Sequence, residues 1–166
     1  MSSVVVAAAL RRLAQQPVST VEPEAVEALQ DALAVEHAAL WSYALAIAFL
    51  PTAQARQARD DADEHRELRS AIEQTLTDLG HRPVSAQPAY ATPRPVTDAE
   101  SAAELLVIAE TDALAAWRSV MEHTVDRPLR RAALEALSKS TRRCARWRRI
   151  VGTSPAIPVF PGRPGG

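Results

Sequence analysis

The sequence lacks the features of a cross-linked, membrane-spanning or nucleic-acid-binding protein. It has one cysteine, Cys144, so an internal disulfide is excluded and a reducing compartment is the default expectation. No run of 18 apolar residues occurs, which argues against a membrane span. The 19 basic side chains nearly balance the 20 acidic ones, so the overall charge does not favour a nucleic-acid partner. The opening apolar run precedes Arg11 and Arg12, the wrong order for a secretory signal, and we expect a cytoplasmic protein.

Glycine and aromatic residues are also scarce. Aromatic residues make up 4% of the chain and glycines number five, whereas alanine is abundant. This composition favours helices over sheets. Neither a glycine-rich phosphate-binding loop nor a Gly-x-Ser-x-Gly nucleophile motif occurs, so the sequence names no catalytic residue and no nucleotide-type cofactor.

Four long helices are expected from the apolar periodicity, which makes the fold class all-α. Proline or a capping residue stands near the helix starts, and Gly80 and Gly152 follow two of the ends. The expected helices cover 23–50, 52–79, 97–125 and 126–151. The chain then divides into a short N-terminal helix with its linker (1–22), a four-helix bundle (23–152) and an irregular tail (153–166).

The connection over 80–97 decides the topology of the bundle. It contains four prolines and shows no periodicity. About eighteen extended residues reach roughly 55 Å, whereas a helix of about 27 residues is roughly 40 Å long. The segment can therefore cross the whole bundle, so the second and third helices can run parallel. Tight links before 52 and before 128 make the other two consecutive pairs antiparallel.

Polar residues interrupt the apolar stripes near the middle of three helices. Glu36 lies between Leu33 and Leu40 in the first, and Glu110 is the lone acid in the stripe of the third. The second contributes an imidazole and two acids. Because the helix midpoints meet in one layer, oxygen and imidazole groups should converge there, and such ligands suit iron, manganese or zinc. The candidate metal ligands are Glu36, Asp61, Glu64, His65 and Glu110.

Other interpretations of the same residues stay open. A histidine in a helix stripe is more often a satisfied core residue than a ligand, and Asp61 could simply bond His65. Two buried carboxylates require a counter-charge, and a metal, a proton, a protonated His65, or an inward Arg143 or Lys139 would each supply it. The last helix is strongly basic, and we interpret it as a solvated face that offsets the acids of the second helix, because no aromatic residue interleaves its exposed arginines.

At these residues the chain resembles the ferritin-like superfamily. The resemblance covers about 24–162 and rests on Ala34-Val35-Glu36-His37, the acid-and-histidine cluster of the second helix, and Glu110. A finer similarity, to an alanine-rich actinobacterial branch of small ferritin-like domains, includes Trp117-Arg118 and the ending Val159-Phe160-Pro161-Gly162. It implies a bundle with one long crossover.

The sequence departs from the usual di-iron pattern of that superfamily. Ala62 stands where Glu-x-x-His would place an acid, and the last helix turns Ser140 and Cys144 inward with Glu135 as its only acid. A symmetric di-iron centre is therefore not expected. A single metal, an asymmetric pair or a lost site all remain.

Two functions follow from these patterns. The first is a metal-binding bundle, with iron or another divalent metal as its cofactor and iron-dependent redox chemistry as its activity. The alternative is a non-catalytic structural or interaction bundle whose metal site has been lost. The apolar N-terminal helix and the alanine-rich helix faces predict a homodimer, and no substrate can be named.

Overall fold

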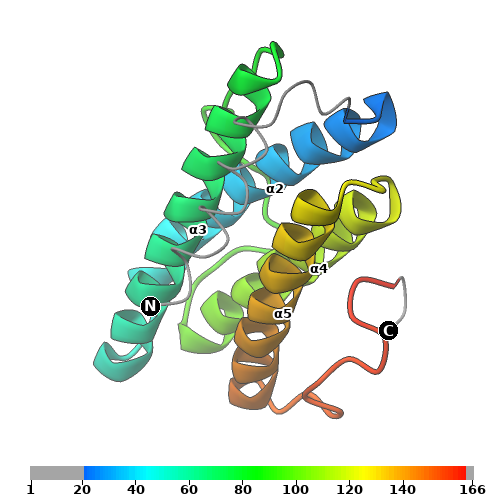
Figure 1. The fold of residues 1–166 in the computed structure, drawn as a ribbon. Helices are drawn as coiled ribbons and strands as arrows, with labels where there is room; N and C mark the ends of the chain where they lie inside the picture. Colours follow the sequence, from blue (N-terminus) through cyan, green and yellow to red (C-terminus); the bar gives the residue numbers. More distant parts are fainter. Residues whose placement is uncertain (1–20, 164–166) are drawn as a thin grey trace.

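The computed structural model describes residues 21–163, and this part of the chain is helical, without strands. The helices are α2 (Pro23–Ile47), α3 (Thr52–Asp78), α4 (Ala99–Glu122) and α5 (Arg127–Ile150) (Figure 1). The expected all-α four-helix bundle is thus confirmed. The short helix expected over 3–16 lies outside the described residues.

The helix boundaries follow the capping chemistry of the sequence. The Asp98 carboxylate accepts from the Ser101 amide at 2.8 Å, and the Ser101 hydroxyl accepts from the Asp98 amide at 3.1 Å, which forms a capping box. Asp126 accepts from the Leu129 amide at 2.8 Å at the start of α5. The first helix ends at Ile47 and not at 50, because Pro51 disfavours the helical conformation in the residue before it and the chain turns over 48–50.

Two apolar clusters at opposite ends of the bundle establish the helix directions. One contains Leu29 of α2 and Leu76 of α3, with residues from the end of α4 and the start of α5. The other contains Ala46 of α2 and Trp147 of α5, with residues from the starts of α3 and α4. Helices α3 and α4 therefore run parallel, as the long connection predicts, while α2 and α4 run antiparallel.

The connection between α3 and α4 follows α2 along the bundle. The Gln30 side chain donates to the carbonyl of Arg82 at 2.8 Å and accepts from the amide of Val84 at 2.9 Å. Further along, the rings of Trp41 and Tyr90 lie 6.0 Å apart. The crossover is thus attached to α2 at both of these points, and its predicted course is confirmed.

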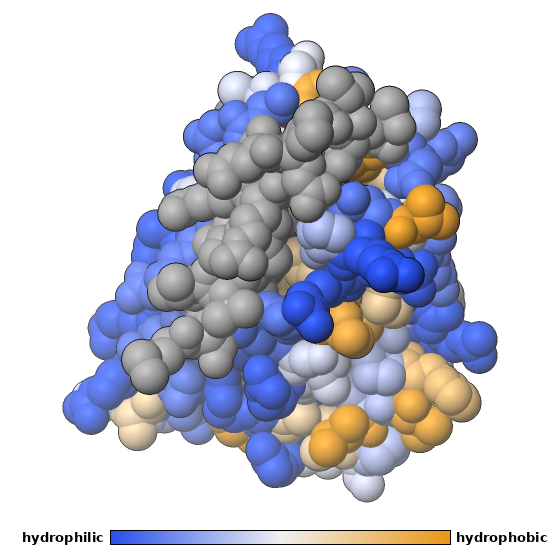
Figure 2. Space-filling model, in the orientation of Figure 1, coloured by the Kyte–Doolittle hydropathy of each residue, from blue (hydrophilic) through white to orange (hydrophobic). Residues whose placement is uncertain are grey.

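The helix interfaces differ in character. Small residues such as Ala32 and Ala113 are buried where α2, α4 and their neighbours pack closely. Alanine on these helices thus serves internal packing. The backbones of α3 and α5 have few close approaches, and long charged side chains bridge them instead. The face that shows α3 and α5 is mainly hydrophilic over its described part, with scattered apolar residues (Figure 2).

None of the described helices is long and apolar enough to cross a membrane.

The tail after α5 returns to α4. Gly162 has a φ of 81°, and a Cβ there would lie 2.5 Å from the carbonyl oxygen of Leu114 and 2.9 Å from Cβ of Arg118. Only glycine permits both the left-handed backbone and this close approach. The end of the described chain therefore lies directly against the C-terminal half of α4.

Candidate functional site

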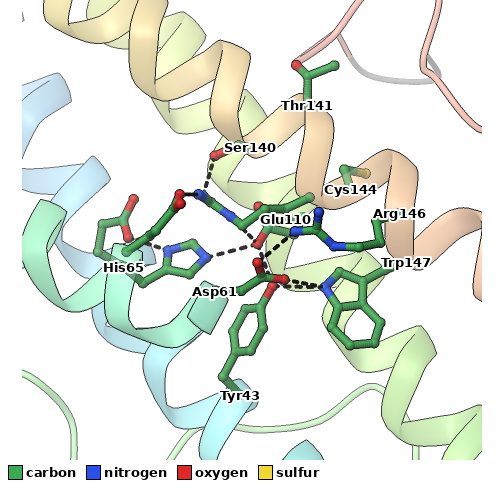
Figure 3. A network of polar contacts seen from close by, with 12 residues as sticks. Tyr43, Asp61, His65, Glu110, Ser140, Thr141, Cys144, Arg146 and Trp147 are labelled. Atoms are coloured by element: carbon green, nitrogen blue, oxygen red, sulfur yellow. Dashed lines mark hydrogen bonds and ion pairs between the residues drawn. The ribbon is translucent and has the colours of Figure 1, made fainter. Parts of the chain in front are cut away.

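The three interrupting residues Glu36, His65 and Glu110 meet in one buried layer, and each has no exposed surface. His65 lies between the two carboxylates. Its Nδ1 is 2.6 Å from Oε2 of Glu36, and its Nε2 is 2.9 Å from Oε1 of Glu110 (Figure 3). The predicted convergence of these three side chains is therefore observed.

The surroundings of His65 favour its protonated form. Burial opposes the charge, and so does the nearby Arg143, but the carboxylates of Glu36 and Glu110 outweigh both and raise the pKa of His65 to about 9. Both ring nitrogens then donate to carboxylate oxygens. At neutral pH the side chain is an imidazolium that links α2 to α4 through α3.

A second buried cation comes from α5. Arg143 donates from Nε to Oε1 of Glu110 at 2.8 Å, from Nη1 to Glu64 at 2.9 Å, and from Nη2 to the hydroxyl of Ser140 at 2.9 Å. Burial alone would raise the pKa of Glu110, but Arg143 and His65 lower it to about 2. The two carboxylates of Glu36 and Glu110 are therefore balanced in this layer by two cations, His65 and Arg143. The sequence allowed an inward Arg143 or Lys139 as a counter-charge, and Arg143 is the cation that bonds Glu110.

Aromatic donors complete the network. Tyr43 donates its hydroxyl to Oε1 of Glu110 at 2.6 Å, and Trp117 donates to Glu36 at 2.9 Å. Trp147 shares its indole N–H between the Tyr43 oxygen at 3.1 Å and Asp61 at 3.2 Å. These three residues were not predicted as donors from the sequence. An aromatic residue with a polar atom beside a buried acid was the available signal. We call Glu36, Tyr43, His65, Glu110, Trp117, Arg143 and Trp147 together the core charge network.

The remaining candidate ligands, Asp61 and Glu64, bond residues other than His65. Asp61 is buried, and its Oδ1 accepts hydrogen bonds from Arg146 at 2.6 Å and from Gln57 at 3.0 Å. It therefore does not serve as the partner of His65. Burial raises the pKa of Asp61, although Arg146 opposes the shift. The Glu64 side chain is 40% exposed and pairs with Arg143. The arginines of α5 thus offset acids of α3 as interpreted from the sequence, although Arg143 is buried and is not part of a solvated face.

A second buried histidine lies outside this network. Only 7% of the surface of His37 is accessible. The crossover covers it, and its Nε2 lies 3.2 Å from the carbonyl oxygen of Val84. The helical pattern alone could not show that a proline-rich segment packs over this position.

The donor set in this arrangement does not fit a divalent metal ion. Both nitrogens of His65 face carboxylates, and Oε1 of Glu110 already accepts from Tyr43, His65 and Arg143. Within 21–163, no three or more His, Cys, Asp or Glu residues are grouped so as to hold a metal. Oε2 of Glu110 is buried and has no hydrogen-bond partner among the described residues. The arrangement suits a charge-balanced structural core, while metal uptake by the protein stays a prediction.

Comparison with known proteins places the chain in a family. Residues 28–165 match the domain of unknown function DUF4439. The chain belongs to the DUF4439 family. It is also similar to the crystal structure of a conserved hypothetical protein, rv2844, from Mycobacterium tuberculosis, with 35% sequence identity and a TM-score of 0.75 over 83% of this chain and 97% of that one. No curated protein matches the chain significantly. These matches establish the DUF4439 family, and the ferritin-like superfamily stays a resemblance.

Proposed function

We propose that this DUF4439 protein is a non-catalytic helical bundle that serves as a structural or interaction module. One observation carries the proposal. The guanidinium of Arg143 lies against Glu110 in the layer where a metal would need the same carboxylate. An organic cation at that point satisfies the electrostatic requirement of the buried acids without a metal.

The core charge network gives the bundle a defined helix register. Each of the four helices contributes at least one member, and the bonds from His65 and Arg143 join groups on different helices. Sliding one helix by a residue would leave charged groups buried without partners, which is costly. A stable register keeps an outer surface constant, as an interaction module requires.

Metal analysis tests the proposal. Protein purified without chelators, and again after incubation with Fe²⁺, Mn²⁺ or Zn²⁺ and desalting, is expected to hold far less than one equivalent of metal. Glu36→Ala and Glu110→Ala should then lower stability without changing metal content. Asp31→Ala, on the exposed side of α2, is the matched control. One equivalent of metal that disappears in Glu110→Ala but persists in Asp31→Ala would instead support the metal-binding bundle, with iron or another divalent metal as cofactor.

We also infer that the protein acts as a homodimer in the cytoplasm. The support for association is the tail, which presents Ile157, Val159 and Phe160 at 60, 70 and 56% exposure. Apolar side chains gathered on one docked segment suit a protein partner better than water. Light scattering should show a dimer that Phe160→Ser weakens, whereas a monomer at millimolar concentration would contradict the inference. The cytoplasmic location rests on the single cysteine and stays an expectation.

A further inference from the structure

An apolar groove lies between α2, α4 and the crossover, outside the core charge network. Its volume is about 220 Å³, and no residue of the network lines it. Its walls are mostly small or aliphatic residues of the two helices, such as Ala38 and Leu105, and its remaining side is formed by Tyr90, Ala91 and Pro93 of the crossover. A concave apolar surface of this kind suits an apolar occupant, and we call it the crossover groove.

The size of the crossover groove suits one aromatic side chain. Pockets for drug-sized ligands usually measure roughly 300–1,000 Å³, whereas an apolar cavity of about 150 Å³ already holds a benzene ring. The chain has two phenylalanines, and Phe160 in the tail is the more exposed of them, at 56% against 37% for Phe49. The tail residues Ile157 and Val159 are exposed as well. The same molecule therefore carries an apolar groove and an exposed apolar ring of matching size.

The groove and the tail lie on either side of the exposed surface of α4. Asp112 lines the groove, whereas Gly162 of the tail lies against Leu114 and Arg118. Each helical residue adds about 100°, so these two residues are turned roughly 200° and 240° from Asp112 around the helix axis. The exposed Ala115 lies between the two sites. The tail thus runs along the outside of the α4–α5 pair and does not cover the groove of its own chain (Figure 1).

We propose that the tail of a second copy of this chain fills the crossover groove. A two-fold axis that runs parallel to α4 over its exposed side exchanges the two flanks, so the tail of each copy meets the groove of the other. The Phe160 ring enters between α2 and α4 beside Tyr90, and the pairing closes as a dimer with two identical contacts. This inference rests on the homodimer inferred above and names the surface that joins its two copies.

The charges beside the ring and the groove agree with this pairing. The guanidinium carbon of Arg163 lies 5.1 Å from the centroid of the Phe160 ring. Asp112 is the one charged residue among the described residues that line the groove, and it is exposed. When the ring enters, Arg163 reaches the edge of the groove and faces Asp112 of the other copy. An exposed ion pair adds little affinity, but opposite charges favour one orientation of two surfaces. The apolar ring therefore selects the groove, and the charges orient it.

Sedimentation of the full chain over a dilution series measures the dimer dissociation constant of each variant. Because about half of the Phe160 surface is still to be buried, each contact is worth about tenfold in that constant, and Phe160→Ser should weaken the dimer about a hundredfold. Ala91→Trp fills the groove from its exposed crossover side and should weaken the dimer to a similar extent. Ala89→Trp, at an exposed crossover position outside the groove, is the matched control and should leave the constant unchanged. Circular dichroism checks that each variant is folded.

A mixing experiment tests the reciprocal contact. Phe160→Ser keeps an open groove and Ala91→Trp keeps the ring, so a mixed dimer regains one of the two contacts. The mixture should associate about tenfold more tightly than either variant alone. A dimer that Phe160→Ser weakens but Ala91→Trp does not would preserve the homodimer and refute the groove as its docking site. A mixture no tighter than the separate variants would also refute it, whereas a wild-type monomer at millimolar concentration would remove the homodimer itself.

Discussion

Replacement of Arg143 by methionine probes the core charge network most directly. Methionine retains most of the apolar stem but removes the guanidinium, so Glu110 loses a buried cation while His65 and Tyr43 still donate to it. Loss of one member of a buried ion pair costs about 3–5 kcal/mol. The bond to Ser140 adds about 1 kcal/mol, and the bond to the 40%-exposed Glu64 adds little because water screens it. The free energy of unfolding should therefore fall by about 4–6 kcal/mol.

Urea denaturation at pH 7, monitored by far-ultraviolet circular dichroism, measures this change. Thermal melting should show a decrease of roughly 10–20 °C for a chain of this length. Arg142→Met is the matched control, because Arg142 is the preceding residue and is exposed. The double variant Glu110→Gln with Arg143→Met should be less destabilised than the sum of the two single variants, since neither charge is then left alone. Equal stability losses in Arg143→Met and Arg142→Met would refute the reasoning.

Three further perturbations have defined outcomes. His65 has a folded pKa of about 9, above its ordinary value of 6.5, so its contribution is complete below about pH 6.5 and is lost as the pH rises through 9. Glu110, with a pKa of about 2, contributes fully above about pH 4.5 and loses this as the pH falls through 2. Urea midpoints should therefore fall from pH 6.5 to 9.5, and a flat profile would contradict the imidazolium. Trp117→Phe removes a donor to buried Glu36 and should cost about 1–3 kcal/mol by the same assay, whereas a loss below 0.5 kcal/mol would count against that bond. Gly162→Ala should displace the tail and speed its limited proteolysis. Gly152→Ala should not, because Gly152 has a similar φ but no atom near the position of an added Cβ. Equal proteolysis rates for the two variants would argue against the close approach of the tail to α4.

Helical periodicity predicted the helices and the depth of the buried charges, and the lengths of the connections predicted the helix directions. The stripes placed Glu36, His65 and Glu110 at helix midpoints, and antiparallel or parallel packing alike brings midpoints together. The long connection over 80–97 allowed only a limited set of topologies, and the observed one is among them. These features depend on Cα positions, which a regular helix fixes.

The chemistry of the site depended on side-chain directions that the sequence does not fix. Arg143 and Lys139 were equally placed to enter the layer, and Arg143 is the one that donates to Glu110. Asp61, one turn from His65, instead accepts from Arg146 because its rotamer points toward α5. A metal and a guanidinium satisfy the same two acids, so the composition of the layer predicted that a cation is needed but did not specify which.

The sparse approach of α3 to α5 has a consequence for the motions of the molecule. Helices α2 and α4 share close packing of small residues, whereas α3 and α5 meet chiefly through ion pairs and hydrogen bonds that water can replace at their outer ends. Local opening should therefore begin at the α3–α5 side, with each helical hairpin rotating as a unit about α2 and α4. Amide hydrogen exchange should reach the middle turns of α3 and α5 before those of α2 and α4. The solvent gap formed in this way would hydrate the core charge network without unfolding any helix.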